Sequence, residues 1–548
     1  MNKARTFLVW AGLLSLALLL PRFAVADWPT DPSVNVPVCT AVGDQSHSAI
    51  VRDGAGGAIV TWVDWRSNSN GDIYAQKISV GGAVQWTANG VVLCTATALP
   101  ASPTITSDGA GGAIVAWGDG RGICAQRISA GGVVQWAANG VALCTIYSQN
   151  PPPTIISDGA GGAIATWTDQ RGGNIDIYAQ RISAGGVVQW TANGVALCKA
   201  TGTQYDPAIA SDGAGGAIVT WRDYRLWGRP SDIYAQRISA AGAAQWIADG
   251  VALCNASNYQ GGQVITSDGA GGAIVAWDDE RSGGDQAYVQ RISAGGAVQW
   301  PVDGVPLGTA SPASIVSDGA GGAIVATSGG QAQRISAAGA VQWGAGGVTL
   351  STTGGRSMIV SDGAGGAVVA WEDSRNLTNS DIYAQRISAG GVAQWPVGGV
   401  ALCTADSSQV DATIASDGGG GAIVAWQDYR NLTNPDIYAQ RVQANGQLGG
   451  TVDVSGDAAL AFALDPVRPN PSRGGMLTVR FTLPTAAPAR LELLDVAGRR
   501  IASREVGSLG AGQHTLDLGA GQHLAPGLYL VRLTQGANKR TTRVAVLR

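Results

Sequence analysis

The sequence predicts an all-β protein, in which an eight-bladed β-propeller of four-stranded blades is followed by a small Ig-like β-sandwich. Glycine supplies 80 of the 548 residues, about twice the usual share. Only 14% of residues are charged, which is typical of short strands joined by tight turns. A phrase close to S-D-G-A-G-G-A-I-V-A-W recurs eight times without any helical period. Repeats of this length with β patterning indicate a propeller or a β-solenoid.

The first 26 residues carry the pattern of a secretory signal peptide. Lys3 and Arg5 precede an apolar run over residues 7–20, and Ala-Val-Ala at 24–26 provides small residues before Asp27. We therefore expect residues 1–26 to be removed on export and the mature chain to start at Asp27. The apolar run is shorter than the roughly 20 residues of a membrane helix, and we expect no membrane span in the mature chain.

The repeats, expected over residues 27–445, have strands and turns in a constant order. The recurring phrase places one aspartate in each unit: Asp53, Asp108, Asp158, Asp212, Asp268, Asp318, Asp362 and Asp417. In the third unit we expect four strands, at 153–156, 163–167, 176–182 and 187–190, followed by an extended phrase at 194–198. The D-G-A-G-G and S-A-G-G turns between them indicate hairpins. Four strands are the content of one propeller blade.

The two ends of the repeat array complement each other. The eighth unit runs from Asp436 to Leu448 without the V-Q-W and G-V-A-L-C phrases that end other units. A matching phrase stands ahead of the first unit, at Val34-Asn35-Val36-Pro37-Val38-Cys39. An open solenoid would need caps at both ends, whereas a terminal strand that completes the last blade closes a ring. We therefore expect a closed propeller rather than a solenoid.

Tryptophan, cysteine and an Asp-x-Arg pair recur at fixed places in the repeat, and we interpret all three as structural. Two series of seven tryptophans are expected to fill the space between blades, with carbohydrate stacking as the alternative. The two charged residues of D-x-R lie on one face of a strand and can form a charge-assisted hydrogen bond to each other or to a neighbouring loop. Six of the seven cysteines occupy the same position of V-x-L-C or V-P-V-C, and we expect small buried residues there rather than disulfides.

Length and sequence vary after D-x-R and after V-A-L-C, whereas the two hairpin turns hardly change. In a four-stranded blade these variable segments lie on one face of the disc, and loops on a rigid scaffold often carry recognition. This face is therefore the candidate ligand face, with neutral drift of exposed loops as the alternative. The candidate residues are Asn68, Asn70, Trp227, Arg229, Asn376, Asn379, Asn431 and Asn434.

The sequence changes character after a glycine- and alanine-rich linker at 446–458. Residues 459–548 contain 12 Lys/Arg and 5 Asp/Glu, a net charge of +7, and their alternating apolar positions indicate an Ig-like sandwich. Three phrases stand out, P-N-P at 469–471, D-V-A-G-R-R at 495–500 and G-L-Y-L-V at 527–531. Their defining residues are Pro469, Asn470, Pro471, Asp495, Gly498, Arg499, Gly527 and Tyr529.

These phrases, closed by a basic terminal strand, resemble the C-terminal sorting domain of type IX secretion substrates and the related Ig-like domain of flagellar hook-capping proteins. The resemblance implies export across the outer membrane of a Gram-negative-type bacterium. It also implies that the outer-membrane secretion machinery is a partner and that the protein is secreted or held at the outer cell surface. It says nothing about what the propeller binds.

Composition and motifs favour a non-catalytic binding or scaffold module over an enzyme. The chain has three histidines, His47, His514 and His523, so the repeats offer neither a Ser-His-Asp set nor a histidine metal site. We expect no catalytic residues, no cofactor and no metal, and no nucleic acid because basic and aromatic residues do not cluster. A glycan or a surface protein is the expected ligand. The alternatives are a secreted propeller hydrolase or lyase that acts on glycans through paired acids, and a coat protein without a ligand.

Overall fold

A computed structural model describes residues 27–67, 70–95, 100, 102–146, 152–226, 230–449, 462–465, 467, 470, 472–473, 477–483, 488–506, 512–518, 524–536 and 538–547. The predicted signal peptide and most of the predicted linker lie outside these residues. The chain divides into two compact units, Met1–Thr451 and Val452–Arg548, and each is described by itself. The elements of both units are β-strands.

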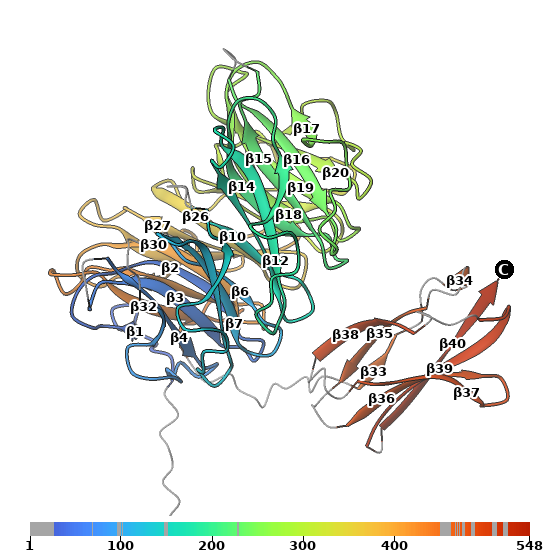
Figure 1. Ribbon diagram of the computed structural model, residues 1–548. Coiled ribbons are helices and arrows are strands. Elements are labelled where there is room, and N and C mark those ends of the chain that lie inside the picture. Colours follow the sequence, from blue (N-terminus) through green and yellow to red (C-terminus); the bar gives the residue numbers. More distant parts are fainter. Residues whose placement is uncertain are drawn as a thin grey trace, which may run out of the picture. The chain divides into compact units, whose positions relative to one another are not determined.

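The first unit contains eight four-stranded antiparallel sheets, the blades of a propeller (Figure 1). From the inner to the outer strand, blade one consists of β2 (Gln45–Arg52), β3 (Ala58–Asp64), β4 (Asp72–Ile78) and β5 (Val91–Cys94). Blades two to four are β6 (Thr104–Ser107), β7 (Ala113–Asp119), β8 (Gly122–Ile128), β9 (Val141–Cys144); β10 (Thr154–Ser157), β11 (Ala163–Asp169), β12 (Asp176–Ile182), β13 (Val195–Cys198); and β14 (Gln204–Ser211), β15 (Ala217–Asp223), β16 (Asp232–Ile238), β17 (Val251–Cys254).

Blades five to eight continue this order. Blades five to seven are β18 (Gln260–Ser267), β19 (Ala273–Asp279), β20 (Gln286–Ile292), β21 (Val305–Pro306); β22 (Pro312–Ser317), β23 (Ala323–Thr327), β24 (Gln331–Ile335), β25 (Val348–Thr349); and β26 (Gly354–Ser361), β27 (Ala367–Asp373), β28 (Asp381–Ile387), β29 (Val400–Cys403). Blade eight combines β30 (Gln409–Ser416), β31 (Ala422–Asp428) and β32 (Asp436–Val442) with β1 (Val36–Cys39) from the other end of the chain. The predicted eight blades of four strands are confirmed.

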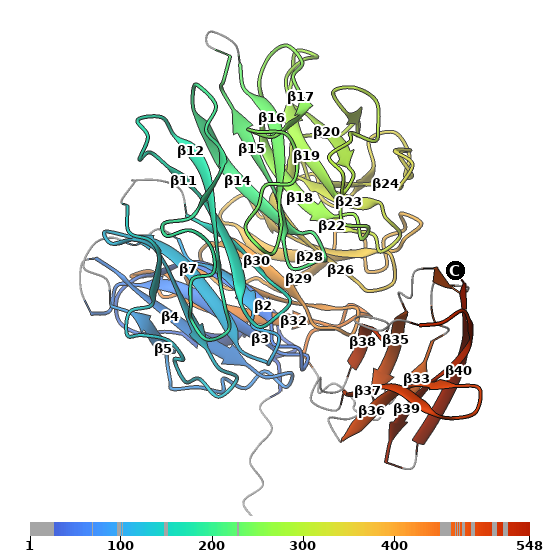
Figure 2. The ribbon, with the colours of Figure 1, turned by 45° about the vertical axis from the view of Figure 1, so that its right-hand side comes forward.

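The N-terminal strand closes the ring. β1 pairs antiparallel with β32, so that Val36 lies opposite Ala439. The inner strand β2 of blade one contacts β30 of blade eight, and Figure 2 shows β2, β30 and β32 side by side. The side-chain amide of Asn35 donates to Leu402 O at 2.9 Å. The predicted completion of blade eight by residues 34–39 is thus confirmed, and the array is a ring rather than an open solenoid.

The fourth strand of each blade differs from the prediction. In blade three it is β13 (Val195–Cys198), whereas the V-V-Q-W segment at 187–190 forms only an isolated bridge between Val188 and Ile182. The reason is a buried glutamine. Gln180 accepts a hydrogen bond from Trp190 N at 3.0 Å and donates to Thr191 O at 2.8 Å. A side chain thus satisfies backbone groups that a strand ladder would otherwise pair.

The predicted linker begins too early. Residues 446–449 belong to blade eight, because Leu448 bridges to Val442 and Gly446 lies directly under the ring of Trp395. This turn has the same form as the S-A-G-G turns of the other blades, with Gly446 N donating to Gln443 O at 2.9 Å. The different sequence, Q-A-N-G-Q-L, conceals the equivalence.

One tryptophan series joins each blade to the next. The indole N–H donates to a backbone carbonyl of the following blade, as from Trp190 to Ala240 at 3.0 Å, and the ring occupies the place that a side chain on Gly242 would need. Blade eight has no V-Q-W phrase, yet Trp28 takes this role: it is 1% exposed and donates to Val80 O at 2.9 Å. Sequence reasoning gives no sign of this, because the context D-W-P-T has nothing in common with V-Q-W.

The D-x-R pair forms a second contact between blades. In blade five, Asp279 accepts hydrogen bonds from Trp277 Nε1 and from Arg281 Nε, both at 2.8 Å. The Arg281 guanidinium lies over the ring of Tyr288, 4.1 Å from its centre, and donates to Cys254 Sγ of the preceding blade at 2.9 Å. The pair therefore makes the structural contact that was expected of it.

Where the D-x-R pair is missing, the cysteine that would face it is missing too. Blade six has Thr327 in place of the tryptophan, and Gly308 stands at the cysteine position of blade five. Ahead of blade seven, Ser351 replaces the cysteine and donates to Asp373 Oδ2 at 2.9 Å. The repeated cysteines are therefore parts of the D-x-R contact.

We expect the seven cysteines to resist thiol reagents in the folded protein. All seven are free and buried, and burial raises the pKa of Cys254 to about 12, so that the reactive thiolate is scarce at neutral pH. Iodoacetamide followed by mass spectrometry should label none of them before unfolding and all of them afterwards. Rapid labelling of any blade cysteine in the native protein would contradict this packing.

The second unit contains two sheets around one core. The three-stranded sheet has the order β33 (Ala463–Leu464), β35 (Thr478–Leu483), β38 (Gly512–Asp517). The five-stranded sheet has the order β34 (Ser472–Arg473), β40 (Asn538–Leu547), β39 (Gly527–Gln535), β36 (Ala489–Asp495), β37 (Arg500–Glu505). Phe481, Leu491 and Val531 are fully buried in the shared core. Two layers around one core are the arrangement expected of a small β-sandwich.

Candidate functional site

The loops after D-x-R and the crossings between blades share one rim of the propeller, which we call the variable rim. In several blades the loop bonds to the crossing beside it: Gln204 N donates to Ile175 O at 2.8 Å, and Gln409 N to Ser380 O at 2.7 Å. At the ring closure, Gln45 N donates to Pro435 O at 2.8 Å. The D-G-A-G-G and S-A-G-G turns lie at the other ends of the same strands.

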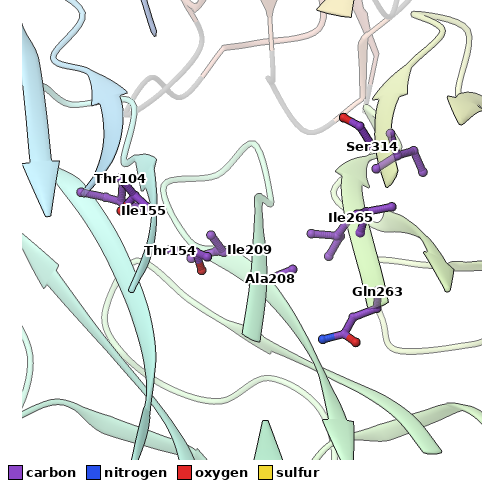
Figure 3. A pocket seen from close by; sticks show the side chains of 10 residues that line it. Thr104, Thr154, Ile155, Ala208, Ile209, Gln263, Ile265 and Ser314 are labelled. Atoms are coloured by element: carbon purple, nitrogen blue, oxygen red, sulfur yellow. The ribbon is translucent and has the colours of Figure 1, made fainter. Parts of the chain in front are cut away.

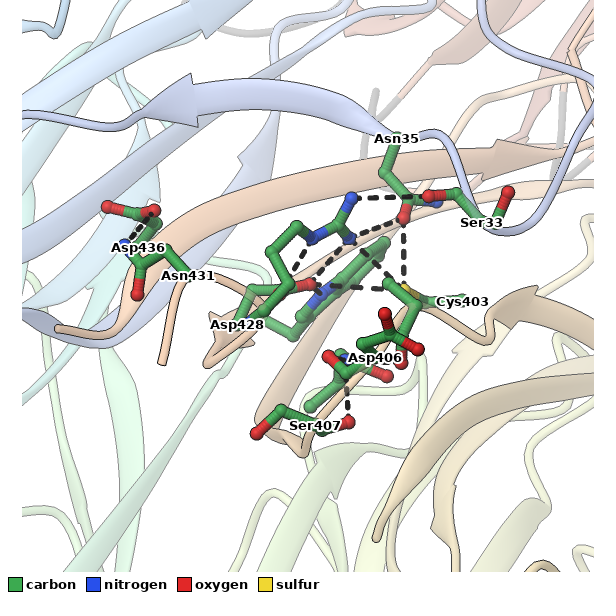
Figure 4. Close-up of polar contacts among 12 residues, drawn as sticks. Ser33, Asn35, Cys403, Asp406, Ser407, Asp428, Asn431 and Asp436 are labelled. Atoms are coloured by element: carbon green, nitrogen blue, oxygen red, sulfur yellow. Dashed lines mark hydrogen bonds and ion pairs between the residues drawn. The ribbon is translucent and has the colours of Figure 1, made fainter. Parts of the chain in front are cut away.

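The asparagines predicted for the ligand face hold the variable rim together. Asn431 donates to Asp436 Oδ2 at 2.8 Å (Figure 4), and Asn379 donates to Ser407 O in the next crossing at 2.7 Å. Asn376 donates to Asp381 as Asn431 does to Asp436, and Asn434 donates to Asp44 in the next crossing as Asn379 does to Ser407. Asn70 is half-buried. Asn68, Trp227 and Arg229 lie outside the described residues. The four loop asparagines therefore position the rim.

The residues that distinguish one blade from another are not these loop asparagines. The middle residue of W-x-D changes around the ring: Val63, Gly118, Thr168, Arg222, Asp278, Glu372 and Gln427. These residues lie beside the first residues of the inner strands, where Tyr205 is opposite Arg222 and Gly261 opposite Asp278. This one changing position was the signal in the sequence that could have identified them.

Bulges at the starts of several inner strands add further polar residues. His47, Asp206 and Asp411 have φ values of 54°, 54° and 52°, a conformation that non-glycine residues rarely adopt. We call this blade-specific set the channel mouth; its members are His47, Asp206, Arg222, Gln263, Asp278, Arg356, Glu372, Asp411 and Gln427. Residues in strained conformations cluster at binding sites in many proteins.

The channel mouth has an acidic part between blades seven and eight. Glu372 accepts a hydrogen bond from Asp411 N at 2.8 Å. The Asp411 carboxylate accepts one from Gln427 at 2.6 Å and lies 3.8 Å from Arg356. Burial, reinforced by the charge of Asp411, raises the pKa of Glu372. Burial likewise raises the pKa of Asp278, whose carboxylate accepts a hydrogen bond from Ser311 at 3.0 Å.

The mouth has an aromatic part between blades four and five. Arg222 forms an ion pair with Asp206 at 2.8 Å and donates to the Tyr259 hydroxyl at 2.8 Å. Its guanidinium lies 5.6–5.8 Å from the ring centres of Tyr205, Tyr224 and Tyr259. Burial alone would lower the pKa of Arg222, but Asp206 and Tyr259 outweigh it and raise the pKa. This arginine is therefore held charged and in a fixed place.

A cavity of about 340 Å³ lies between the inner strands of blades two to six (Figure 3). Its wall mixes apolar side chains, among them Ile155, Ile209 and Ile265, with the hydroxyls of threonine and serine, and Gln263 supplies an amide beside the aromatic part of the mouth. Among the described residues, no three His, Cys, Asp or Glu side chains are placed together to hold a metal. The cavity therefore suits a mainly uncharged ligand.

In the second unit, the residues of the predicted sorting motif fix turns and edges. The Asp495 carboxylate accepts hydrogen bonds from Ala497 N and Arg499 N, and Gly498 has a φ of +79° in this turn. Tyr529 donates to Ala525 O at 2.9 Å; Gly527 begins β39.

The P-N-P phrase contributes one described residue. Asn470 bonds in both directions to the terminal strand β40, donating to Arg543 O at 3.1 Å and accepting from Ala545 N at 3.0 Å. Pro469 and Pro471 lie outside the described residues. The amide of Asn470 thereby attaches the start of the unit to its last strand.

The sequence of this unit matches one known family of domains. Residues 467–547 match the secretion system C-terminal sorting domain. The predicted resemblance is thereby confirmed, and the sorting domain indicates secretion to the cell surface or the extracellular space. Within the residues that the structure describes, no helix has the length and apolar character to cross a bilayer.

The whole chain has weaker similarity to known proteins than its C-terminal unit has. No curated protein matches it. Solved structures that resemble it include a protein of unknown function from Dyadobacter fermentans (9% identity, 75% of this chain and 98% of that one, TM-score 0.37). Others are an ulvan lyase from a new polysaccharide lyase family (11%, 75% and 97%, TM-score 0.42) and the Hadza microbial sialidase Hz136 (10%, 76% and 69%, TM-score 0.36).

Proposed function

We propose that the propeller is a non-catalytic binding module which the sorting domain delivers to the outside of a Gram-negative-type bacterium. In this proposal the outer-membrane secretion machinery handles the C-terminal unit, and the channel mouth holds the ligand. The observation that carries the proposal is the distribution of blade-specific residues. Polar residues that repeat in every blade bond within or between blades, whereas those that differ gather at the channel mouth.

The repeated polar residues support the proposal because their bonding groups are already used. In blade three, Asp158 accepts hydrogen bonds from Ala160 N and Gly162 N at 2.8 Å and pairs with Arg181 at 2.8 Å. Arg181 in turn donates to Ala240 O in blade four at 3.0 Å. Such groups hold blades together and leave little capacity for a ligand.

An enzyme that acts on glycans is the second candidate. It is favoured by the raised pKa of Glu372 and of Asp278, since a glycan hydrolase needs one protonated carboxyl group. Against it, Glu372 is bonded to the backbone of Asp411, and His47 is the one histidine of the described propeller. Incubation of the full chain with soluble polysaccharides should release no reducing ends. Release that Glu372→Gln abolishes would instead favour the enzyme.

We expect substitutions at the channel mouth to weaken binding and substitutions at the opposite rim to leave it unchanged. The full chain, labelled at its surface lysines, would be applied to a glycan array and to a peptide array. Arg222→Met should weaken the interactions found on them by about tenfold or more, which corresponds to 1.4 kcal/mol. The matched control is Val187→Ser, at the exposed position that follows an S-A-G-G turn. Binding that is lost in the control and kept in the mouth variant would contradict the proposal.

A further inference from the structure

The aromatic part of the channel mouth has the composition of a sugar-binding subsite. Tyr205, Tyr224 and Tyr259 are each half-buried, and the rings of Tyr205 and Tyr224 meet edge to face with centres 6.1 Å apart. We propose that this part of the mouth binds one uncharged sugar ring of a glycan. The inference rests on the proposed function, because it assigns a ligand class to the same mouth.

Several buried polar atoms at this place have no protein partner in the described part of the chain; they include both side-chain atoms of Gln204, the Oε1 of Gln260, and one atom each of Gln263 and Arg222. Gln263 is 6% exposed; its amide nitrogen donates to Asp206 O, whereas its Oε1 accepts nothing. Arg222 uses both terminal nitrogens, on Asp206 and Tyr259, whereas its buried Nε donates to nothing. Buried groups of this kind cost free energy unless they find a partner.

At least one acceptor, Gln263 Oε1, and one donor, Arg222 Nε, are therefore free, and both of these side chains contact Asp206. A hydroxyl group both donates and accepts, so a ligand whose binding turns these two side chains toward it can donate to Gln263 Oε1 and accept from Arg222 Nε. A cation could satisfy Gln263 but not Arg222, and an anion could satisfy Arg222 but not Gln263. The pair of free atoms therefore favours an uncharged ligand with several hydroxyls.

The surrounding groups favour the same ligand class. The charge of Arg222 is already paired with Asp206, so an acidic sugar would find no free cation here and would face the carboxylate of Asp278. The tyrosine rings offer half-exposed faces whose negative charge attracts the positively polarised C–H groups of a sugar ring. The isoleucines of the adjoining cavity accommodate the apolar edge of the next sugar unit.

The chain itself provides a matched control. Tyr224 and Tyr429 follow D in the same phrase, W-x-D-Y-R, of blades four and eight. Tyr429 lies on the same rim and is 37% exposed, but blade eight has Gln427 where blade four has Arg222. An alanine at either position removes the same ring. Both sites have an unpartnered glutamine oxygen nearby, but the free Nε of Arg222 and the free Oε1 of Gln263 belong to the Tyr224 site.

The test is calorimetric titration of the full chain with neutral cello-, xylo-, manno- and galacto-oligosaccharides, with oligogalacturonate as the acidic comparison. We expect at least one neutral series to bind and oligogalacturonate not to bind. Tyr224→Ala and Gln263→Leu should each weaken binding by about tenfold, whereas Tyr429→Ala should not change it. Tyr259→Phe keeps the ring and the fold but frees Arg222 from its hydroxyl partner, and it should weaken binding less than Tyr224→Ala.

Three results would overturn the sugar assignment. The first is the absence of binding by every neutral series, and the second is preferential binding of oligogalacturonate. The third is an equal effect of Tyr224→Ala and Tyr429→Ala. If a peptide still binds in a manner that Arg222→Met abolishes, the proposed function stands and only the ligand class is wrong. If the mouth variants change the binding of no ligand, both the proposed function and the sugar assignment are wrong.

Discussion

Trp28→Ala should destabilise the propeller by about 3–5 kcal/mol, the usual cost of removing a buried tryptophan. Trp28 stands before the first blade in the chain, but it is 1% exposed and bonds to Val80 of blade one. Its indole joins blade eight to blade one, as the V-Q-W tryptophans join the other blades. Urea unfolding followed by tryptophan fluorescence measures the effect as a lower midpoint.

The control for this prediction is Val42→Ala. Val42 lies in the crossing from β1 to β2 and is 90% exposed, so its substitution should change the unfolding free energy by less than about 0.5 kcal/mol. Deletion of residues 27–39, which removes β1 with the buried Val36 and Val38, should prevent cooperative unfolding altogether. A deletion variant as stable as the full chain would show that the ring does not need its N-terminal strand.

Asp428→Ala should destabilise the propeller by about 3–5 kcal/mol, because it leaves the half-buried guanidinium of Arg430 and the indole N–H of Trp426 without their partner. Asp428 is fully buried and accepts hydrogen bonds from Trp426 Nε1 at 2.7 Å and from Arg430 at 2.8 and 2.6 Å (Figure 4). Arg430 also bonds to Asn35 at 2.7 Å, so the substitution weakens the ring closure as well. Urea unfolding again gives the magnitude.

Glu505→Ala is the matched control, since the exposed Arg490–Glu505 pair should contribute less than about 1 kcal/mol.

The D-x-R contacts also predict acid sensitivity. Burial alone would raise the pKa of Asp279, but hydrogen bonds from Arg281 and Trp277 outweigh burial and lower this pKa below its ordinary value. Such a group stabilises the fold above the ordinary carboxyl pKa, and the stabilisation is lost as pH falls through the lowered value. Unchanged stability in acid, or equal effects of the two variants, would contradict this account.

The repeated architecture was predictable from the sequence because its determinants are local. The D-G-A-G-G turns, the alternating strands and the phrase at 34–39 identify eight blades and their closure without any knowledge of distant contacts. The fourth strand was assigned wrongly because Val187–Trp190 has the alternation of a strand, while the side chain of Gln180 bonds Trp190 N and Thr191 O and ends the ladder there. Trp28 was missed because only the closed ring brings it to Val80.

The candidate site was less predictable than the fold. Loop length directed attention to asparagines such as Asn379 and Asn434, whose amides bond within the rim. The residues that distinguish the blades, Arg222 and Glu372 among them, lie inside the most regular phrase. Variation at a single position of such a phrase is easily interpreted as neutral. Their proximity to the inner-strand bulges depends on register and could not be seen in the sequence alone.

Hydrogen–deuterium exchange of the full chain, with and without a bound neutral oligosaccharide, tests most directly whether recognition takes place at the channel mouth. The account predicts slower exchange in peptides that cover 204–206, 222–224 and 259–263, with unchanged exchange in the D-G-A-G-G turns. Protection confined to those turns, or spread equally over all eight blades, would contradict it.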